Sequence, residues 1–155
     1  MRAQDLMTQP IAICDVNDTL DIAAKKMWDF DCGVIAVVRE DGKLAGMITD
    51  RDIAMAAYTQ GRPLHDLLVN ASMAKHPVAV HADHRLAEIE QVMAEHQVRR
   101  VPVVDADNKP IGVISLTDLV LESVQPDTRM KNGPSTIAHL HAAICRPHSS
   151  KKRAA

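Results

Sequence analysis

Two short stretches of the sequence place polar side chains at the same spacing after apolar residues. They are residues 46–52 (GMITDRD) and residues 112–118 (GVISLTD), and in both a Thr or Ser is followed three positions later by Asp. The polar positions are Thr49, Asp52, Ser115 and Asp118. A hydroxyl residue three positions before an acid is typical of a helix capping box, in which the two side chains satisfy free backbone N–H groups.

The same arrangement can also bind a nucleotide. The first turn of a helix presents N–H groups and a positive dipole to an anion, and a Thr or Ser hydroxyl adds a hydrogen bond to phosphate. A carboxylate can accept hydrogen bonds from two ribose hydroxyls, and Gly46 and Gly112 allow a close backbone approach. Capping is the more generic explanation of the pattern, so the sequence leaves both explanations open.

An internal repeat must position these stretches. Residues 7–52 and 73–118 align at a constant offset of 66, with ten identical positions. Each copy predicts a short strand (residues 11–13 or 78–80), a helix, two strands joined by a tight turn, and a second helix. We therefore predict an α+β fold of two β-α-β-β-α repeats, residues 1–62 and 63–126, packed by a pseudo-two-fold axis, because neither copy alone buries enough surface.

Composition narrows the function classes. The chain has 155 residues, of which 46% are hydrophobic and 25% charged, which excludes intrinsic disorder. A net charge of −2 and only three aromatic residues count against nucleic-acid partners. No apolar run is long enough for a membrane helix, and the first ten residues have no apolar leader core. Three widely spaced cysteines favour a reducing compartment, so we expect a cytoplasmic protein that is not bound to a membrane.

No known catalytic motif is present in the sequence. It lacks Gly-x-Ser-x-Gly, His-Glu-x-x-His, a P-loop and Cys-x-x-Cys. Asp50 and Asp52 form a pair of acids, but the intervening Arg51 and the capping position favour binding over acid–base catalysis. We therefore expect a binding protein and not an enzyme.

The chain resembles the tandem cystathionine-β-synthase (CBS) domain pair, the Bateman module, in its small stand-alone form. The resemblance rests on the doubled β-α-β-β-α unit, on residues 98–104 (VRRVPVV), and on residues 48–53 (ITDRDI) with their partner stretch in the second copy. It covers about residues 4–124. It implies a regulatory module with two clefts between the repeats, each able to hold AMP, ADP, ATP or S-adenosylmethionine, with no cofactor required for catalysis.

The resemblance also implies a set of ligand contacts. Asp52 and Asp118 would hold ribose, and Thr49 and Ser115 would hold phosphate. The remaining implied contacts are the backbone around Ile11, Ile13, Val78 and Val80, the apolar side chains Ile35 and Val101, and the cations Arg51 and Arg100. The two clefts cannot be equivalent, because residues 33–36 (GVIA) of the first copy stand where the second has residues 99–102 (RRVP).

The C-terminal residues 127–155 form a tail of different composition. A short helix over residues 135–145 is predicted, with one apolar stripe formed by Ile137, Leu140 and Ile144. His141 and Cys145 are four residues apart on this helix and His139 is nearby, so these three are candidate zinc ligands. Residues 151–153 (KKR) are interpreted as a solvated end.

An alternative function therefore stays open at this point. The chain could instead be a metal- or redox-responsive protein that uses the tail residues together with Cys14, with vestigial nucleotide sites. In either case the apolar stripe needs a partner surface, and we expect a homodimer, because closed two-fold association is the commonest state of homo-oligomers.

Overall fold

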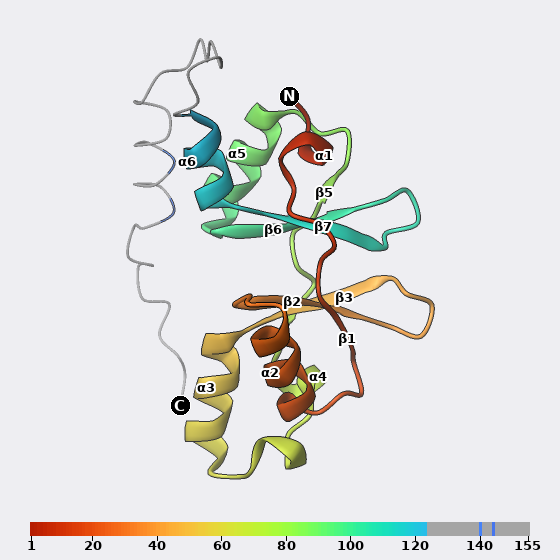
Figure 1. The fold of residues 1–155 in the computed structure, drawn as a ribbon, viewed down its shortest axis with the longest axis vertical. Helices are drawn as coiled ribbons and strands as arrows, with labels where there is room; N and C mark the ends of the chain where they lie inside the picture. The colour runs from red at the N-terminus through yellow and green to blue at the C-terminus, as the bar shows by residue number, and fades with distance from the viewer. Residues whose placement is uncertain (124–139, 141–143, 145–155) are drawn as a thin grey trace.

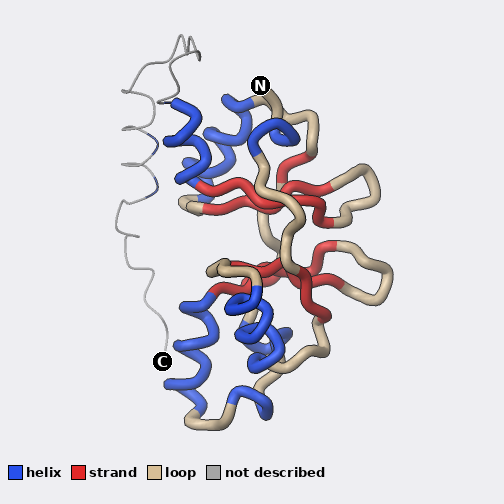
Figure 2. The backbone as a smooth tube through the Cα atoms, in the orientation of Figure 1, coloured by secondary structure: helices blue, strands red, loops and turns tan. Residues whose placement is uncertain are grey.

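The computed structural model describes residues 1–123 together with Leu140 and Ile144. Two β-sheets lie next to each other in the middle of the molecule, and helices cover their outer faces (Figures 1 and 2). The two halves repeat the same arrangement about a pseudo-two-fold axis. The predicted α+β class and the packing of two repeats are therefore confirmed.

The first half contains a four-stranded sheet in the order β1-β2-β3-β4. Its strands are β1 (Ile13–Asp15), β2 (Val34–Val38), β3 (Leu44–Thr49) and β4 (Ala74–Lys75). Its helices are α2 (Leu20–Asp29), α3 (Asp50–Gln60), the 3-10 turn η1 (Leu64–Asp66) and α4 (Val69–Ser72). On α2 the side chains of Leu20, Ala23 and Met27 are buried, as their helical spacing predicts.

The second half contains a three-stranded sheet in the order β5-β6-β7. Its strands are β5 (Val80–His81), β6 (Arg100–Val104) and β7 (Pro110–Ser115), and its helices are α1 (Ala3–Leu6), α5 (Leu86–His96) and α6 (Leu116–Ser123). The hairpin registers of the two halves match at the offset of 66, since Val34 pairs with Thr49 and Arg100 pairs with Ser115.

Three apolar clusters hold these layers together. One lies under the helices of the first half and includes Leu20, Ile35 and Ile48. A second lies under the helices of the second half and includes Met93 and Ile114. The third joins the two sheets to each other and consists of Ile11, Val34, Ala36, Leu44, Met47 and Val104, with Ala79 and Val113 packed against it.

The opening segment of each repeat crosses to the other half. Residues 3–6 form α1 against the second half, and Thr8 pairs antiparallel with Val113 of β7. At the offset of 66, Ala74 of β4 pairs in the same way with Met47 of β3 in the first half. The packing units therefore differ from the sequence units 1–62 and 63–126, because each sheet is completed by a segment that opens the other repeat.

The crossing also explains why residues 11–12 and 78–79 lie outside the strands predicted for them. The strands begin later, at Ile13 and Val80. Ile11 instead packs in the cluster between the two sheets, and Ala79 packs against that cluster. These residues are the places where the chain passes from one half to the other.

Leu140 and Ile144 are the described residues of the C-terminal segment. Both are helical, are 5% and 6% exposed, and belong to the apolar cluster of the second half. This agrees with their predicted places on one apolar stripe, whereas Ile137 and the rest of the predicted helix lie outside the described residues. Within the described part of the chain, no helix is long and apolar enough to cross a membrane.

Two glycines allow the crossing segments to pack closely on the sheets. A Cβ on Gly46 would lie 2.5 Å from the sulfur of Met73 and 2.8 Å from the backbone oxygen of Ala74. A Cβ on Gly112 would lie 2.6 Å from the sulfur of Met7. The sequence suggested that another group comes close to the backbone at these two glycines. In the structure that group is the side chain of Met73 at Gly46 and of Met7 at Gly112.

We expect Gly46→Ala to destabilise the fold more than Gly112→Ala. Both substitutions overpack a methionine, which costs about 1–3 kcal/mol, but only the Cβ at position 46 also meets backbone. Chemical denaturation measures both changes. The second substitution Met7→Ala should recover much of the loss in Gly112→Ala, whereas Met73→Ala should recover little in Gly46→Ala. Equal recovery in the two pairs would contradict this account.

Candidate functional site

The first element of the site is the start of α3, which carries a complete capping box. The backbone N–H of Thr49 and its hydroxyl both donate to Oδ2 of Asp52, at 2.9 and 2.7 Å. The N–H of Asp52 in turn donates to the Thr49 hydroxyl at 3.2 Å. These bonds fix both side chains at the junction of β3 and α3.

The start of α6 repeats this geometry. The N–H and hydroxyl of Ser115 both donate to Oδ2 of Asp118, each at 2.7 Å. The N–H of Asp118 donates to the Ser115 hydroxyl at 3.3 Å. The capping interpretation of both stretches is thus confirmed. In each aspartate Oδ1 accepts no hydrogen bond from the described residues, so one carboxylate oxygen stays available to a ligand.

A cleft of about 240 Å³ joins the start of α3 to the second half of the molecule. Its polar side chains are Thr49 and Asp52 from the first half and Arg99 and Arg100 from the second. Its apolar walls are Val34, Met47, Ala74, Pro77, Val78, Val98 and Pro102. Larger hollows exist elsewhere on the surface, but a mostly apolar cleft with a few converging polar groups is the arrangement that binds small molecules.

The charges of the cleft suit an anionic group with a polar neighbour. Arg99 and Arg100 are exposed at the start of β6, and among the described residues neither forms an ion pair. They lie across the cleft from the N–H groups and positive dipole at the start of α3. The cleft therefore offers two uncompensated cations and a helix N-terminus to an anion, with the Asp52 carboxylate beside them as a hydrogen-bond acceptor.

Four of the residues singled out from the sequence line this cleft: Thr49, Asp52, Val78 and Arg100. Ser115 and Asp118 occupy the equivalent positions of the other half, at α6. Arg51 points elsewhere, into a hollow of about 410 Å³ that it shares with Met55 and Thr59 of α3. Ile11 packs between the sheets, and Ile13 is exposed on β1.

Three further residues of the predicted site have buried side chains. The side chains of Ile35, Val80 and Val101 are each 0% exposed and fill the cores of the two halves. Each lies on a strand with its side chain toward the helices, so it supports the cleft only through the strand. We leave these three side chains out of the candidate site.

Sequence reasoning missed Arg99 as a cleft residue. The two arginines replace Gly33 and Val34 at the offset of 66, and this pair was the available signal. The structure brings both arginines to the cleft that contains Thr49, while Val34 also lines it. At the offset of 66, the first repeat has the uncharged Gly33 and Val34 at the positions of these arginines, which is the inequivalence of the two copies that the sequence predicts.

The described cysteines are not arranged as a metal or redox centre. Cys14 is buried, and burial raises the pKa of its thiol to about 11, with the charge of Asp18 acting in the same direction. A thiol with so high a pKa is a poor nucleophile and a poor metal ligand near neutral pH. The described part of the chain holds no group of three His, Cys, Asp or Glu side chains fit for a metal. His139, His141 and Cys145 lie outside the described residues.

This fold and this cleft define a pair of CBS domains. The chain belongs to the CBS domain family, whose model matches residues 3–58 and 66–125. It is 38% identical over 138 residues to the uncharacterized protein YlbB of Bacillus subtilis, covering 88% of this chain and 91% of that protein. It is 31% identical over 117 residues to hypoxic response protein 1 of Mycobacterium tuberculosis, covering 76% and 81% of the two chains.

Solved structures share the same fold. Hypoxic response protein I with two coordinated zinc ions matches with a TM-score of 0.70 and 30% identity, over 78% of this chain and 98% of that one. The CBS domain pair of protein MJ0100, in complex with 5′-methylthioadenosine and S-adenosyl-L-methionine, matches with a TM-score of 0.68 and 24% identity, over 78% and 94%. CBSX2 in complex with AMP matches with a TM-score of 0.66 and 24% identity, over 77% and 93%.

Proposed function

We propose that this chain is a regulatory module that binds an adenosine-containing ligand in the cleft between its two halves. The observation that carries the proposal is the convergence of Thr49 and Asp52 with Arg99 and Arg100 in one mostly apolar cleft. The AMP and S-adenosyl-L-methionine in the structures of two CBS pairs with this fold support the ligand class.

Different residues of the cleft would contact different parts of the ligand. The two arginines and the start of α3 would hold a phosphate, and the free Oδ1 of Asp52 would accept from ribose. The Thr49 hydroxyl now donates to Asp52; donation to a phosphate would replace that bond, while the N–H of Asp52 would keep Thr49 as its acceptor. The apolar walls around Val78 and Met47 would take the base.

Ligand binding, and not catalysis, is what this site does in our proposal. The polar groups of the cleft are two guanidinium groups, a carboxylate and an alcohol that the carboxylate already holds in the helix cap, and we assign all of them to holding a ligand. A ligand that contacts both halves would stabilise their junction. The module would report the ligand through that change in stability, which is an equilibrium shift and needs no chemical step.

An adenine nucleotide should raise the melting temperature of the chain. A ligand at 100 times its dissociation constant adds about 2.7 kcal/mol of stability. Arg99→Ala and Arg100→Ala should each weaken AMP binding by about 10- to 100-fold, because each removes a hydrogen bond to a charged group worth about 1.5–3 kcal/mol. Isothermal titration calorimetry measures AMP, S-adenosylmethionine and adenosine, and adenosine binding should change little in either variant.

A matched pair of variants controls for folding. Asp52→Asn retains an oxygen for the α3 cap but loses the charge beside the ribose, and Asp118→Asn makes the same change in the cap of α6. Asp52→Asn should weaken AMP more than Asp118→Asn at similar loss of stability. The proposal fails if neither AMP nor S-adenosylmethionine at millimolar concentration shifts the melting curve.

Zinc binding by the tail is a second candidate function. It is favoured by the two coordinated zinc ions of hypoxic response protein I, which is 30% identical to this chain. We propose His139, His141 and Cys145 as the ligands, since the last two are four residues apart as on one helix face. Cys14 is not part of this candidate site because its thiol stays protonated.

We expect zinc, if bound, to depend on the tail and not on Cys14. Elemental analysis of the purified chain should give the same zinc content for the wild type and Cys14→Ala, and a lower content for His141→Ala and Cys145→Ala. A wild-type chain that takes up no zinc from a zinc-buffered solution would remove this candidate. Loss of zinc in Cys14→Ala would show that the zinc site includes Cys14, which would contradict this assignment.

We also propose that the module is a homodimer through the outer faces of α3 and α6. Met55 of α3 and Leu121 of α6 occupy equivalent positions in the two repeats and are 46% and 58% exposed. Tyr58, one turn after Met55, is 83% exposed. Apolar side chains at matching positions on two neighbouring helices form a self-complementary surface that a two-fold partner can cover.

Light scattering should therefore give twice the chain mass of 17.0 kDa. The double variant Met55→Glu and Leu121→Glu should have the mass of one chain, because dimerisation would bury the new carboxylates without basic groups to pair with them. The control Ile13→Glu and Ile22→Glu, on exposed positions away from α3 and α6, should leave the mass doubled. A wild type with the mass of one chain at micromolar concentrations would show this proposal to be wrong.

A further inference from the structure

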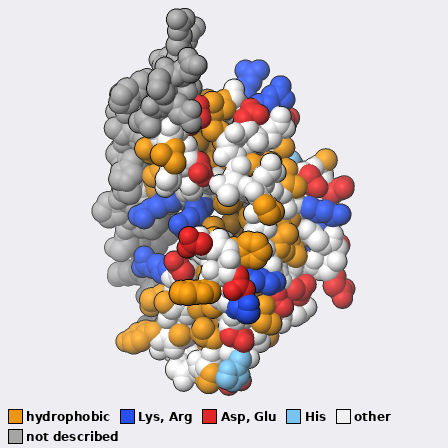
Figure 3. All heavy atoms as spheres, in the orientation of Figure 1, with side chains coloured by type: hydrophobic (Ala, Val, Ile, Leu, Met, Phe, Trp, Pro, Cys, Tyr) orange, Lys and Arg blue, Asp and Glu red, His pale blue; other side chains and the backbone are white. Residues whose placement is uncertain are grey.

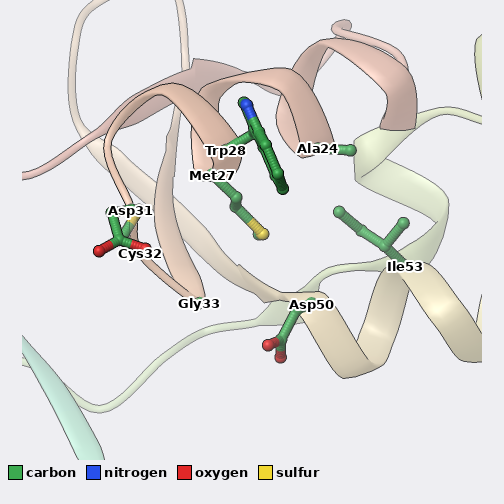
Figure 4. A pocket seen from close by; sticks show the side chains of 8 residues that line it. All are labelled: Ala24, Met27, Trp28, Asp31, Cys32, Gly33, Asp50 and Ile53. Carbon is green, nitrogen blue, oxygen red and sulfur yellow. The ribbon is translucent and has the colours of Figure 1, made fainter.

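A second hollow, of about 430 Å³, lies between α2 and α3 on the outer side of the first half. Its floor is apolar, formed by Ala24, Met27 and Ile53. Figure 4 shows the indole ring of Trp28 on one side of the gap and the carboxylate of Asp50 on the other, with Met27 and Ile53 between them. Trp28 is the only tryptophan of the chain and is 86% exposed.

The rim of this hollow is negatively charged. Asp31 and Asp50 both line it, and among the described residues neither carboxylate has a basic partner. Asp50 accepts a hydrogen bond from the N–H of Arg51 at 2.7 Å, which leaves its charge uncompensated. On the face drawn in Figure 3, apolar, acidic and basic side chains are exposed side by side over the first half. An exposed indole flanked by carboxylates is an environment that attracts an organic cation.

The equivalent groove of the second half is covered by the chain itself. At the offset of 66, Met27 and Ile53 correspond to Met93 and Leu119 of α5 and α6. Those two belong to the apolar cluster that Leu140 and Ile144 complete, and both are 0% exposed. A groove between the two helices of a repeat is thus a place where this protein packs a later segment of its own chain. In the first half the groove is open, and Trp28 and Asp50 stand where the second half has Ala94 and Leu116.

The sequence supplies a segment of the opposite charge. Of the chain's 18 basic and 20 acidic residues, residues 124–155 hold six and one, which leaves 12 and 19 in residues 1–123. Residues 145–153 (CRPHSSKKR) contain four basic residues and no acidic one. The body of the protein is therefore acidic and its last segment is basic, so they attract each other.

We propose that residues 151–153 of this chain dock in the groove between α2 and α3, with a cationic side chain against Trp28 and between Asp31 and Asp50. The aliphatic stem of a Lys or Arg would lie on the apolar floor while its charge meets the carboxylates. The docked segment would continue across the molecule from the anchor that Leu140 and Ile144 form in the second half. It would tie the two halves together on one side.

The chain is long enough for this connection. Ile144 shares an apolar cluster with Val98, and Val98 lines the same cleft as Thr49, the neighbour of Asp50. Shared neighbours therefore connect the anchor, through the cleft, to the start of the helix that carries Asp50. Lys151 is seven residues beyond Ile144, and seven extended residues span up to about 23 Å. Figure 1 shows α3 and α6 on the same side of the two sheets, so no sheet blocks the path.

Quenching of Trp28 fluorescence by acrylamide tests the proposal on the full chain. Acrylamide is uncharged, so it reports access to the indole and not the charge of the surface. The wild type should be quenched at least about twofold less than the triple variant Lys151→Glu, Lys152→Glu and Arg153→Glu, because docking covers one face of the ring. Asp31→Asn with Asp50→Asn should be quenched as strongly as the triple variant, and 1 M salt should remove the difference.

The matched control makes the same charge change on the body, with Arg62→Glu, Lys75→Glu and Lys109→Glu, three exposed residues that do not line the groove. It should be quenched like the wild type. Reversing both partners, with Asp31→Lys and Asp50→Lys added to the tail variant, should restore protection. Circular dichroism confirms that each variant is folded.

Two results would overturn the proposal. A wild type quenched as strongly as the tail variant would show that residues 151–153 do not cover Trp28. Protection that grows with protein concentration would assign the covering segment to a second copy and not to the same chain.

Discussion

The structure depends on one exchange: the segment that opens each repeat completes the sheet of the other half. Thr8 pairs with β7, and Ala74 pairs with β3 at the equivalent position. The glycines at positions 46 and 112 exist for this exchange, since any larger residue would meet Met73 or Met7. Because each half is finished by the other repeat, neither is a complete unit by itself, and every site between them is built from both.

The exchange is made in the same way in both halves, and their hairpin registers match. The two halves therefore differ at their surfaces through a few side chains. Arg99 and Arg100 line the cleft, and the first repeat has Gly33 and Val34 at the corresponding positions. The outer grooves of the two halves differ in the same way. Trp28 and Asp50 of the first repeat correspond to Ala94 and Leu116 of the second. These positions lie at the starts of strands and on helices, and Trp28, Asp50, Arg99 and Arg100 among them are exposed, so their side chains can differ in charge without disturbing the core.

Local patterns predicted the repeat, the hairpins and both capping boxes, because turns, alternating strands and caps depend on residues only a few positions apart. The exchange of opening segments could not be predicted in this way, since Thr8 pairs with Val113 and Met47 pairs with Ala74, and both pairs are far apart in the sequence compared with the few positions that define a turn or a cap. The same limit applies at the candidate site. The apolar character of Ile35 and Val101 does not tell which side of the strand they occupy, and the structure turns both side chains toward the helices. Arg51 and Arg99 look alike in sequence, and only the approach of the two halves brings Arg99 to the cleft.

Capping and the proposed ligand binding compete for a single hydrogen bond at the start of α3, the one from the Thr49 hydroxyl to Oδ2 of Asp52. The cap uses Oδ2 of Asp52 and leaves Oδ1 available, so a ligand can gain a hydrogen bond without unwinding the first turn of the helix. The part of the site in the first half is thus held rigid before any ligand arrives, while the arginines on the other side are exposed and uncompensated. In the function that we propose, a ligand with an anionic group would contact both sides of the cleft. Part of its binding free energy would then stabilise the junction of the halves, and a regulatory partner could sense that change.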